Sequence, residues 1–122
     1  MSKFEIYPVE TGVKFRLLAA NGETVATGEV YRTRAAALRG IESVRGCAAA
    51  GVVLDLTEKK EKVPPNPKFE LFRDKRGAYR FRLRARNGRI IAVSEGYVRH
   101  AAALGGIQSV VENAPTATVE DM

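Results

Sequence analysis

Four arginines alternate with smaller or apolar residues early in the second half of the chain. Arg80, Arg82, Arg84 and Arg86 are each separated by a single residue. Alternate side chains of a strand share one face, so we expect these arginines to form one row, with Arg89 just past a turn. A guanidinium can donate two parallel hydrogen bonds to a phosphate. The row therefore predicts an anion-binding or nucleic-acid-binding face made of Arg80, Arg82, Arg84, Arg86 and Arg89.

The same row also has a purely structural interpretation, which we favour at this stage. Long arginine stems can cover the outer face of a sheet, and Glu70 on a neighbouring strand can pair with one of them. Single-stranded nucleic acid is usually held with aromatic platforms, for which Phe72 and Tyr79 are the candidates. At the matching positions, the first half of the chain supplies only Lys14 and Arg16.

The positive charge of the chain is concentrated in its second half. The net charge is +6 over 122 residues. Residues 1–57 contain seven basic and six acidic side chains, whereas residues 58–122 contain thirteen and eight. A basic balance favours anionic partners through long-range attraction, although many proteins carry such a charge only for solubility.

Other kinds of chemistry have little support in the sequence. Cys47 is the single cysteine and His100 the single histidine, which excludes an internal disulfide, a cysteine-built zinc site and a cluster of histidines. We expect Cys47 to be a small buried residue and His100 to lie at the surface. No set of acid, base and nucleophile is recognisable, so we expect no catalytic residue, no metal, no cofactor and no enzymatic activity.

The sequence predicts a globular protein of the cytoplasm. No apolar run approaches the roughly 20 residues that a membrane helix needs. No apolar stretch follows the first lysine, so no secretory signal is visible. We therefore expect a cytoplasmic protein without membrane contact, and a monomer.

The chain contains the same unit twice, which determines how the arginine row must be positioned. Lys3-Phe4-Glu5-Ile6-Tyr7 is answered by Lys68-Phe69-Glu70-Leu71-Phe72, and from Phe15 onward the offset is 66 residues. Identical residues at that offset include Phe15/Phe81, Asn21/Asn87, Gly22/Gly88, Glu29/Glu95, Tyr31/Tyr97, Gly40/Gly106 and Ser43/Ser109. We divide the chain into repeat one (1–57), a charged and proline-rich linker (58–67) and repeat two (68–122).

Each repeat is expected to fold as three strands, a helix and a fourth strand. Phe4/Ile6, Phe15/Leu17 and Val25/Thr27 alternate with polar residues, which predicts the three strands. Asn21-Gly22, repeated as Asn87-Gly88, predicts a hairpin with a type I′ turn. A helical stripe follows in repeat one at Ala37, Ile41, Val44 and Ala48, and in repeat two at Ala103, Leu104, Ile107, Val110 and Val111.

The residues at each helix entry are interpreted as structural. Glu29 and Glu95 precede the helices, where a carboxylate can bond backbone N–H groups, and Tyr31 and Tyr97 can anchor the corner. Thr33 is a candidate N-cap, whereas Arg99 at the matching position is not. Gly40 and Gly106 lie inside the helices, which indicates close packing onto the sheet.

A single repeat of about 57 residues would be marginally stable, because it buries only about 60% of its extended surface. Two repeats that share one sheet bury more. We therefore predict an α+β fold in one pseudo-twofold domain, residues 1–122, with one mainly antiparallel sheet and both helices on one face.

The repeated pattern resembles the YegP-like family of small tandem-repeat proteins. The residues that carry the resemblance are the Lys-Phe-Glu opening, the Phe-Arg-Leu strand, Asn21-Gly22, Asn87-Gly88, Ser94-Glu95-Gly96-Tyr97, Ala101-Ala102-Ala103 and Gly106-Ile107-Gln108-Ser109-Val110. The resemblance implies β(3)-α-β repeats that exchange their C-terminal strands. Val52–Leu54 would then pair with repeat two and Thr118–Val119 with repeat one. It implies no activity, cofactor or catalytic residue.

Two functions of different class remain open at the level of sequence. The first is a non-enzymatic module that binds a protein through the sheet edge or the open face. The second is nucleic-acid or polyanion binding through the arginine-rich sheet face of repeat two.

Overall fold

The computed structural model describes residues 1–58 and 62–122; the rest of the predicted linker, residues 59–61, lies outside the described part. Among the described residues, eight strands and two helices follow one another in the predicted order. Repeat one supplies β1 (Lys3–Val9), β2 (Gly12–Leu18), β3 (Thr24–Thr27), α1 (Arg34–Ala48) and β4 (Val53–Asp55). Repeat two supplies β5 (Lys68–Arg73), β6 (Tyr79–Arg84), β7 (Ile90–Val93), α2 (His100–Asn113) and β8 (Thr118–Asp121).

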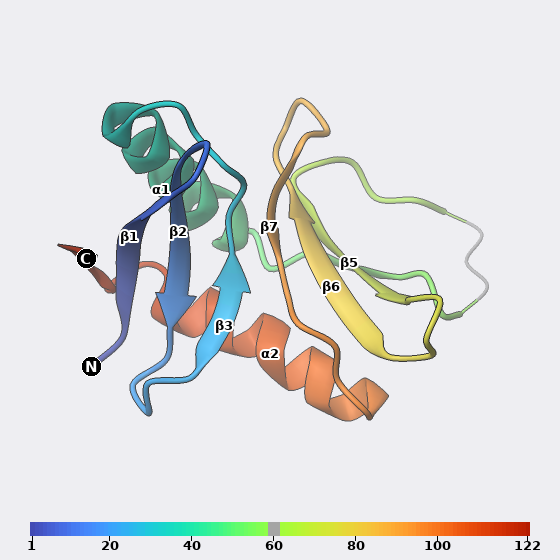
Figure 1. The fold of residues 1–122 in the computed structure, drawn as a ribbon. Coiled ribbons are helices and arrows are strands. Elements are labelled where there is room, and N and C mark those ends of the chain that lie inside the picture. Colours follow the sequence, from blue (N-terminus) through green and yellow to red (C-terminus); the bar gives the residue numbers. More distant parts are fainter. Residues whose placement is uncertain (59–61) are drawn as a thin grey trace.

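All eight strands form one sheet in the order β4-β5-β6-β7-β3-β2-β1-β8 (Figure 1). Only the outer pairs, β4–β5 and β1–β8, are parallel, so the sheet is mainly antiparallel as predicted. These two pairs confirm the strand exchange, because β4 of repeat one pairs with repeat two and β8 of repeat two pairs with repeat one. At the centre, β3 and β7 meet through Thr27 and Val93, two positions that are equivalent in the repeats.

Both helices cover the same face of the sheet, and the opposite face stays open (Figure 1). Alternation along the strands explains the division, because every second residue of β1, β2, β5 and β6 points to the helices. The four phenylalanines of these strands, Phe4, Phe15, Phe69 and Phe81, are almost completely buried. The core is therefore continuous across both repeats.

The hairpin turns at Asn21-Gly22 and Asn87-Gly88 are present, but the type I′ prediction is wrong. A type I′ turn needs positive φ at both central residues, whereas positive φ occurs only at glycines among the described residues. Gly22 has φ +86°, its N–H bonds Ala19 O, and the Ala19 N–H bonds Glu23 O. This is a type I turn closed by a bulged glycine. Asn21 accepts a bond from the Glu23 N–H.

The two helices begin differently, as their first residues predict. The Thr33 hydroxyl accepts a hydrogen bond from the Ala36 N–H at 3.1 Å, so Thr33 caps α1. Arg99 gives α2 no side-chain cap bond within the described residues. The predicted stripe of α1 is buried throughout, whereas in α2 Leu104 is exposed.

The tyrosines at the helix entries explain the glycines inside the helices. Tyr31 forms an isolated β-bridge with Val13 of β2, and its ring stacks on Phe15 with the ring centroids 6.0 Å apart. Its ring lies across α1, where a Cβ on Gly40 would be only 2.6 Å from Tyr31 Cζ. Tyr97 lies across Gly106 in the same way. Glu29 and Glu95 are exposed and, in the described part of the chain, bond no backbone N–H, so that part of the prediction is wrong.

Candidate functional site

The register between β5 and β6 places the central arginines of the row beside one buried carboxylate. Glu70 lies opposite Arg82 on the open face, and Arg84 is the next residue on that face. Glu70 Oε1 accepts hydrogen bonds from Nε of Arg82 at 2.6 Å and from Nε of Arg84 at 2.7 Å. The Glu70 side chain is only 9% exposed. The carboxylate therefore holds both guanidiniums in position against the sheet.

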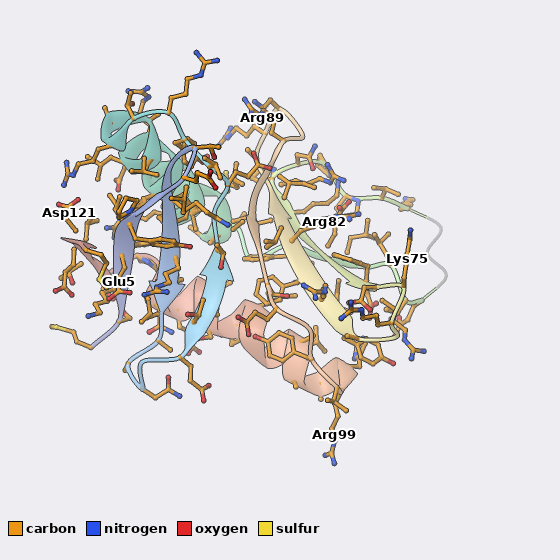
Figure 2. The ribbon with its side chains drawn as sticks, in the orientation of Figure 1. Glu5, Lys75, Arg82, Arg89, Arg99 and Asp121 are labelled. Atoms are coloured by element: carbon orange, nitrogen blue, oxygen red, sulfur yellow. The ribbon has the colours of Figure 1, made fainter. Side chains whose placement is uncertain are left out.

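The neighbouring arginines of the row divide into one paired residue and two that lie beyond the strand. Arg80 bonds Asp74 at 2.7 Å and the carbonyl of Ser94 at 3.1 Å. The strand ends at Arg84, so the prediction that Arg86 continues the row is wrong. Arg86 and Arg89 lie in the β6–β7 turn, and Figure 2 shows Arg89 at the tip of that hairpin. The five arginines therefore do not form one open patch.

Repeat one carries the same arrangement on its half of the open face. Glu5 is buried and accepts bonds from Arg16 at 2.8 Å, and Lys3 lies 3.3 Å from its other oxygen. The guanidinium of Arg16 lies 5.0 Å from the centre of the Tyr7 ring, as that of Arg82 lies 4.5 Å from Phe72. Both halves thus combine a buried glutamate with an arginine that stacks on an aromatic ring.

In each half of the molecule, a polar contact joins the first residue of a helix to the exchanged strand that comes from the other repeat. Arg34, the first residue of α1, forms two hydrogen bonds with Asp121 at the end of β8, at 2.7 and 2.8 Å. The equivalent residues of the other half are His100 and Asp55, whose Nε2 and Oδ2 atoms are 2.6 Å apart. The prediction that His100 is a plain surface residue is therefore wrong, because it is half-buried and paired.

The His100 pair also belongs to the one grouping of metal-ligand atoms found among the described residues. Ligand atoms of Asp55, Glu58 and His100 lie within 4.8 Å of one another. Asp55 is already engaged by His100 and by the hydroxyl and N–H of Thr57. Burial raises the pKa of Asp55, but these bonds outweigh it and the pKa is lowered. These contacts have a structural role, because they join the start of α2 to the end of β4.

Arg45 was not identified from the sequence, although it connects the two repeats. From α1 it donates to the carbonyls of Ala114 and Ala117, which follow α2, at 2.9 and 2.8 Å. Carbonyls at the end of a helix lack intrahelical donors and accept bonds from cations. Repeat two has Val111 at the equivalent position, so the contact exists once. Cys47, close to Arg45 in sequence, is buried as predicted.

The pairing at Glu70 predicts acid-sensitive stability. Burial raises the pKa of Glu70, but the bonds from Arg82 and Arg84 outweigh it and hold the pKa below its ordinary value of 4.5. A carboxylate with a lowered folded-state pKa stabilises the fold above 4.5 and loses this contribution as the pH falls through the folded-state pKa. We expect Glu70→Gln to lower the free energy of unfolding at pH 7 by about 2 kcal/mol, less than for a fully buried pair because both arginines are partly exposed.

Urea unfolding between pH 7 and pH 2.5 measures this effect. The difference between wild type and Glu70→Gln should shrink as the pH falls below 4.5. Glu112→Gln, an exposed residue of α2, is the matched control and should follow the wild type at every pH. A constant difference across the pH range would contradict the assignment of the effect to ionised Glu70.

The fold, together with the ion pairs that both repeats form on the open face, defines a class of protein. Its members are small α+β chains in which two β(3)-α-β repeats exchange strands within one sheet. The chain belongs to the DUF1508 family, a domain of unknown function, whose model matches residues 11–55 and 74–121. The two matched segments fall in the two repeats. The expected YegP-like relationship is confirmed.

Individual relatives differ in length. The chain is similar to the solution NMR structure of the Escherichia coli protein of unknown function yegP, with 30% identity, a TM-score of 0.79 and coverage of 98% of this chain and 91% of that one. It is 33% identical over 121 residues to a UPF0339 protein of Pseudomonas aeruginosa, covering 98% and 96% of the two chains. A UPF0339 protein of Methanosarcina acetivorans is 62% identical over 52 residues, which are 43% of this chain but 90% of that relative. That relative is about one repeat long.

The helices show no membrane-spanning segment. Within the described residues, neither helix has the length and apolar character needed to cross a bilayer.

Proposed function

We propose that the chain is a non-enzymatic interaction module that binds an acidic segment of a partner protein across the open face of its sheet. We define the open face by its charged and aromatic residues: Lys3, Glu5, Tyr7, Lys14, Arg16, Lys68, Glu70, Phe72, Arg80, Arg82, Arg84 and Glu120. Among these, seven side chains are basic and three are acidic. The excess of positive charge favours an acidic partner.

The observation that carries the proposal is that buried carboxylates hold the cations in place before any partner binds. Arg82 donates from Nε to Glu70, and its guanidinium group lies over the Phe72 ring. These two contacts hold the aliphatic stem and the guanidinium plane of Arg82 in place. Its Nη groups have no hydrogen-bond partner in the described part of the chain. A side chain that is already ordered loses little conformational entropy on binding, and arginine and aromatic residues are enriched at the centres of protein interfaces.

Nucleic acid is the second candidate, and the geometry favours it less. Bases need aromatic faces to stack on, but one face of the Tyr7 ring is occupied by Arg16 and one face of the Phe72 ring by Arg82. The charge excess still attracts any polyanion at low salt, so an experiment must compare both partners directly.

Fluorescence anisotropy with two labelled probes tests the proposal. The probes are an acidic peptide of ten residues rich in glutamate and tyrosine, and a single-stranded oligo(U) of equal charge, each titrated at 50 and 200 mM NaCl. We expect the peptide to bind more tightly than the RNA. Arg82→Gln should weaken peptide binding about tenfold, the loss of one charge-assisted contact. Arg84 would still hold Glu70 in this variant, so the fold is retained.

Arg99→Gln is the matched control, because it removes the same charge from a residue that points away from the open face (Figure 2). It should change peptide affinity less than twofold. Equal losses in both variants, or no peptide binding at 50 mM NaCl, would contradict the proposal. Preferential RNA binding with a salt slope near −0.7 per phosphate contact would replace it with the nucleic-acid function.

A further inference from the structure

A pocket of about 320 Å³ opens between α1 and the β6–β7 hairpin, so each repeat supplies one wall. Ligand pockets commonly begin at about 300 Å³. Arg39 and Ser43 line it from α1, Arg89 and Asn87 from the hairpin, and Tyr31 and Glu29 from the entry to α1. We call this pocket the basic groove.

The Tyr31 hydroxyl is a fixed donor inside the basic groove. The Tyr31 ring stacks on Phe15, and its hydroxyl end packs closely against α1 at Gly40, where there is no side chain in the way. The hydroxyl has no hydrogen-bond partner among the described residues, although the ring is half-buried. Burial and the nearby Glu29 raise the pKa of Tyr31, although Arg89 opposes the rise, so the phenol stays protonated at neutral pH.

The two arginines of the basic groove differ from those of the open face. Arg39 and Arg89 are exposed, and their guanidinium groups form no ion pair or hydrogen bond with the described residues. Arg82 and Arg84, in contrast, are bonded to Glu70. Even with Glu29 at its edge, the basic groove retains one excess positive charge, and its donors come from three separate elements.

The pseudo-symmetry of the fold provides an internal comparison. A pocket of about 210 Å³ between α2 and the β2–β3 hairpin is lined by nine residues, each the counterpart of a lining residue of the basic groove. Glu23 replaces Arg89 and Gly105 replaces Arg39, while Tyr97 and Ser109 replace Tyr31 and Ser43. Glu95 lines the adjoining hollow. We call this the acidic groove, since its described lining contains no basic residue. The backbone is thus duplicated and the charge is reversed.

We propose that the basic groove is a binding site for a small organic phosphate. The phosphate group would lie between Arg39 and Arg89, with Tyr31 and Ser43 as further donors. The remainder of the ligand would lie against Ala85 and Ile90, which also line the pocket. Planar guanidinium groups and hydroxyls are the donors that phosphate oxygens prefer. The site is separate from the open face and does not depend on its function.

Titration of the ¹⁵N-labelled full chain with phenyl phosphate tests the proposal by NMR. Amides of Tyr31, Gly40, Ser43 and Arg89 should shift with one common dissociation constant, and their counterparts Tyr97, Gly106, Ser109 and Glu23 should not. Benzyl alcohol and benzylamine have the same ring without the negative charge and should shift none of these amides. Arg89→Glu, which copies the acidic groove, should weaken binding at least about tenfold. Arg39→Gln should act in the same direction.

Transplanting the arginines gives the strictest control. Glu23→Arg combined with Gly105→Arg copies the basic pair into the acidic groove, and a Cβ at Gly105 meets nothing within 4 Å. This variant should bind two molecules of phenyl phosphate and show shifts at Tyr97 and Ser109. Arg82→Gln should leave the affinity unchanged, which separates this site from the open face. Equal shifts in both grooves of the wild type, or unchanged affinity in Arg89→Glu, would overturn the proposal.

Discussion

Expressed without repeat one, repeat two (residues 68–122) is expected to fold only when two copies associate. In the intact chain, the one described strand that pairs with β8 is β1 of repeat one, and Arg34 forms hydrogen bonds with Asp121 of β8. A lone repeat two would leave β8 without its neighbour and the central edge of β7 exposed. A second copy can supply both partners, because the repeats share one fold. The relative from Methanosarcina, about one repeat long, has the length that such an assembly requires.

Sedimentation equilibrium and circular dichroism measure this outcome. The midpoint of thermal unfolding of the fragment should rise with protein concentration, as mass action requires for a folded dimer and an unfolded monomer. The full chain is the control, and its midpoint should not depend on concentration. A fragment that remains monomeric and folded at low micromolar concentration would show that strand exchange is dispensable for stability.

Two adjacent glycines of α2 should respond to alanine in opposite directions. A Cβ on Gly106 would lie 2.5 Å from the Tyr97 hydroxyl and 2.8 Å from Phe81, both on the packed side of the helix. We expect Gly106→Ala to lower the free energy of unfolding by about 2 kcal/mol through overpacking. A Cβ on Gly105 meets nothing within 4 Å, so Gly105→Ala should raise it by about 0.5–1 kcal/mol through helix propensity.

Guanidinium unfolding of both variants, with unchanged slopes, gives the two values. The double variant Gly106→Ala/Tyr97→Phe identifies the cause, because removal of the hydroxyl should recover part of the loss. If both alanines raise the free energy of unfolding, helix propensity rather than packing against Tyr97 controls this helix.

The architecture could be predicted because it is encoded by local patterns that occur twice. The alternation at Phe4 and Ile6, which recurs at Phe69 and Leu71, predicts strands with one buried face. All four residues are buried in the structure. The turn type could not be predicted from Asn21-Gly22 alone, because a bulged type I turn also places its glycine at positive φ. Which of the two forms depends on the register between β2 and β3, which shifts at Leu17/Leu18.

The site was less accessible to sequence reasoning, because its contacts join distant residues. The role of His100 depends on Asp55, which only the exchange of β4 brings close. Glu70 was recognised as a partner for one arginine, whereas it holds two. The grooves are built from a helix of one repeat and a hairpin of the other, which no local motif records. The aligned repeats did contain one signal, the replacement of Glu23 by Arg89.

Joining the repeats in one chain removes a restriction that symmetry imposes on assemblies of identical subunits. In a homodimer every substitution appears at two positions, so dyad-related surfaces must carry the same residues. Here the two halves are separate stretches of one chain, so each can be mutated without changing the other. The two repeats differ accordingly at several positions. Arg45 ties α1 to the end of α2 without a counterpart, and Arg89 faces a groove whose twin holds Glu23. The duplicated scaffold can thus keep one copy of a site while the other is released to specialise.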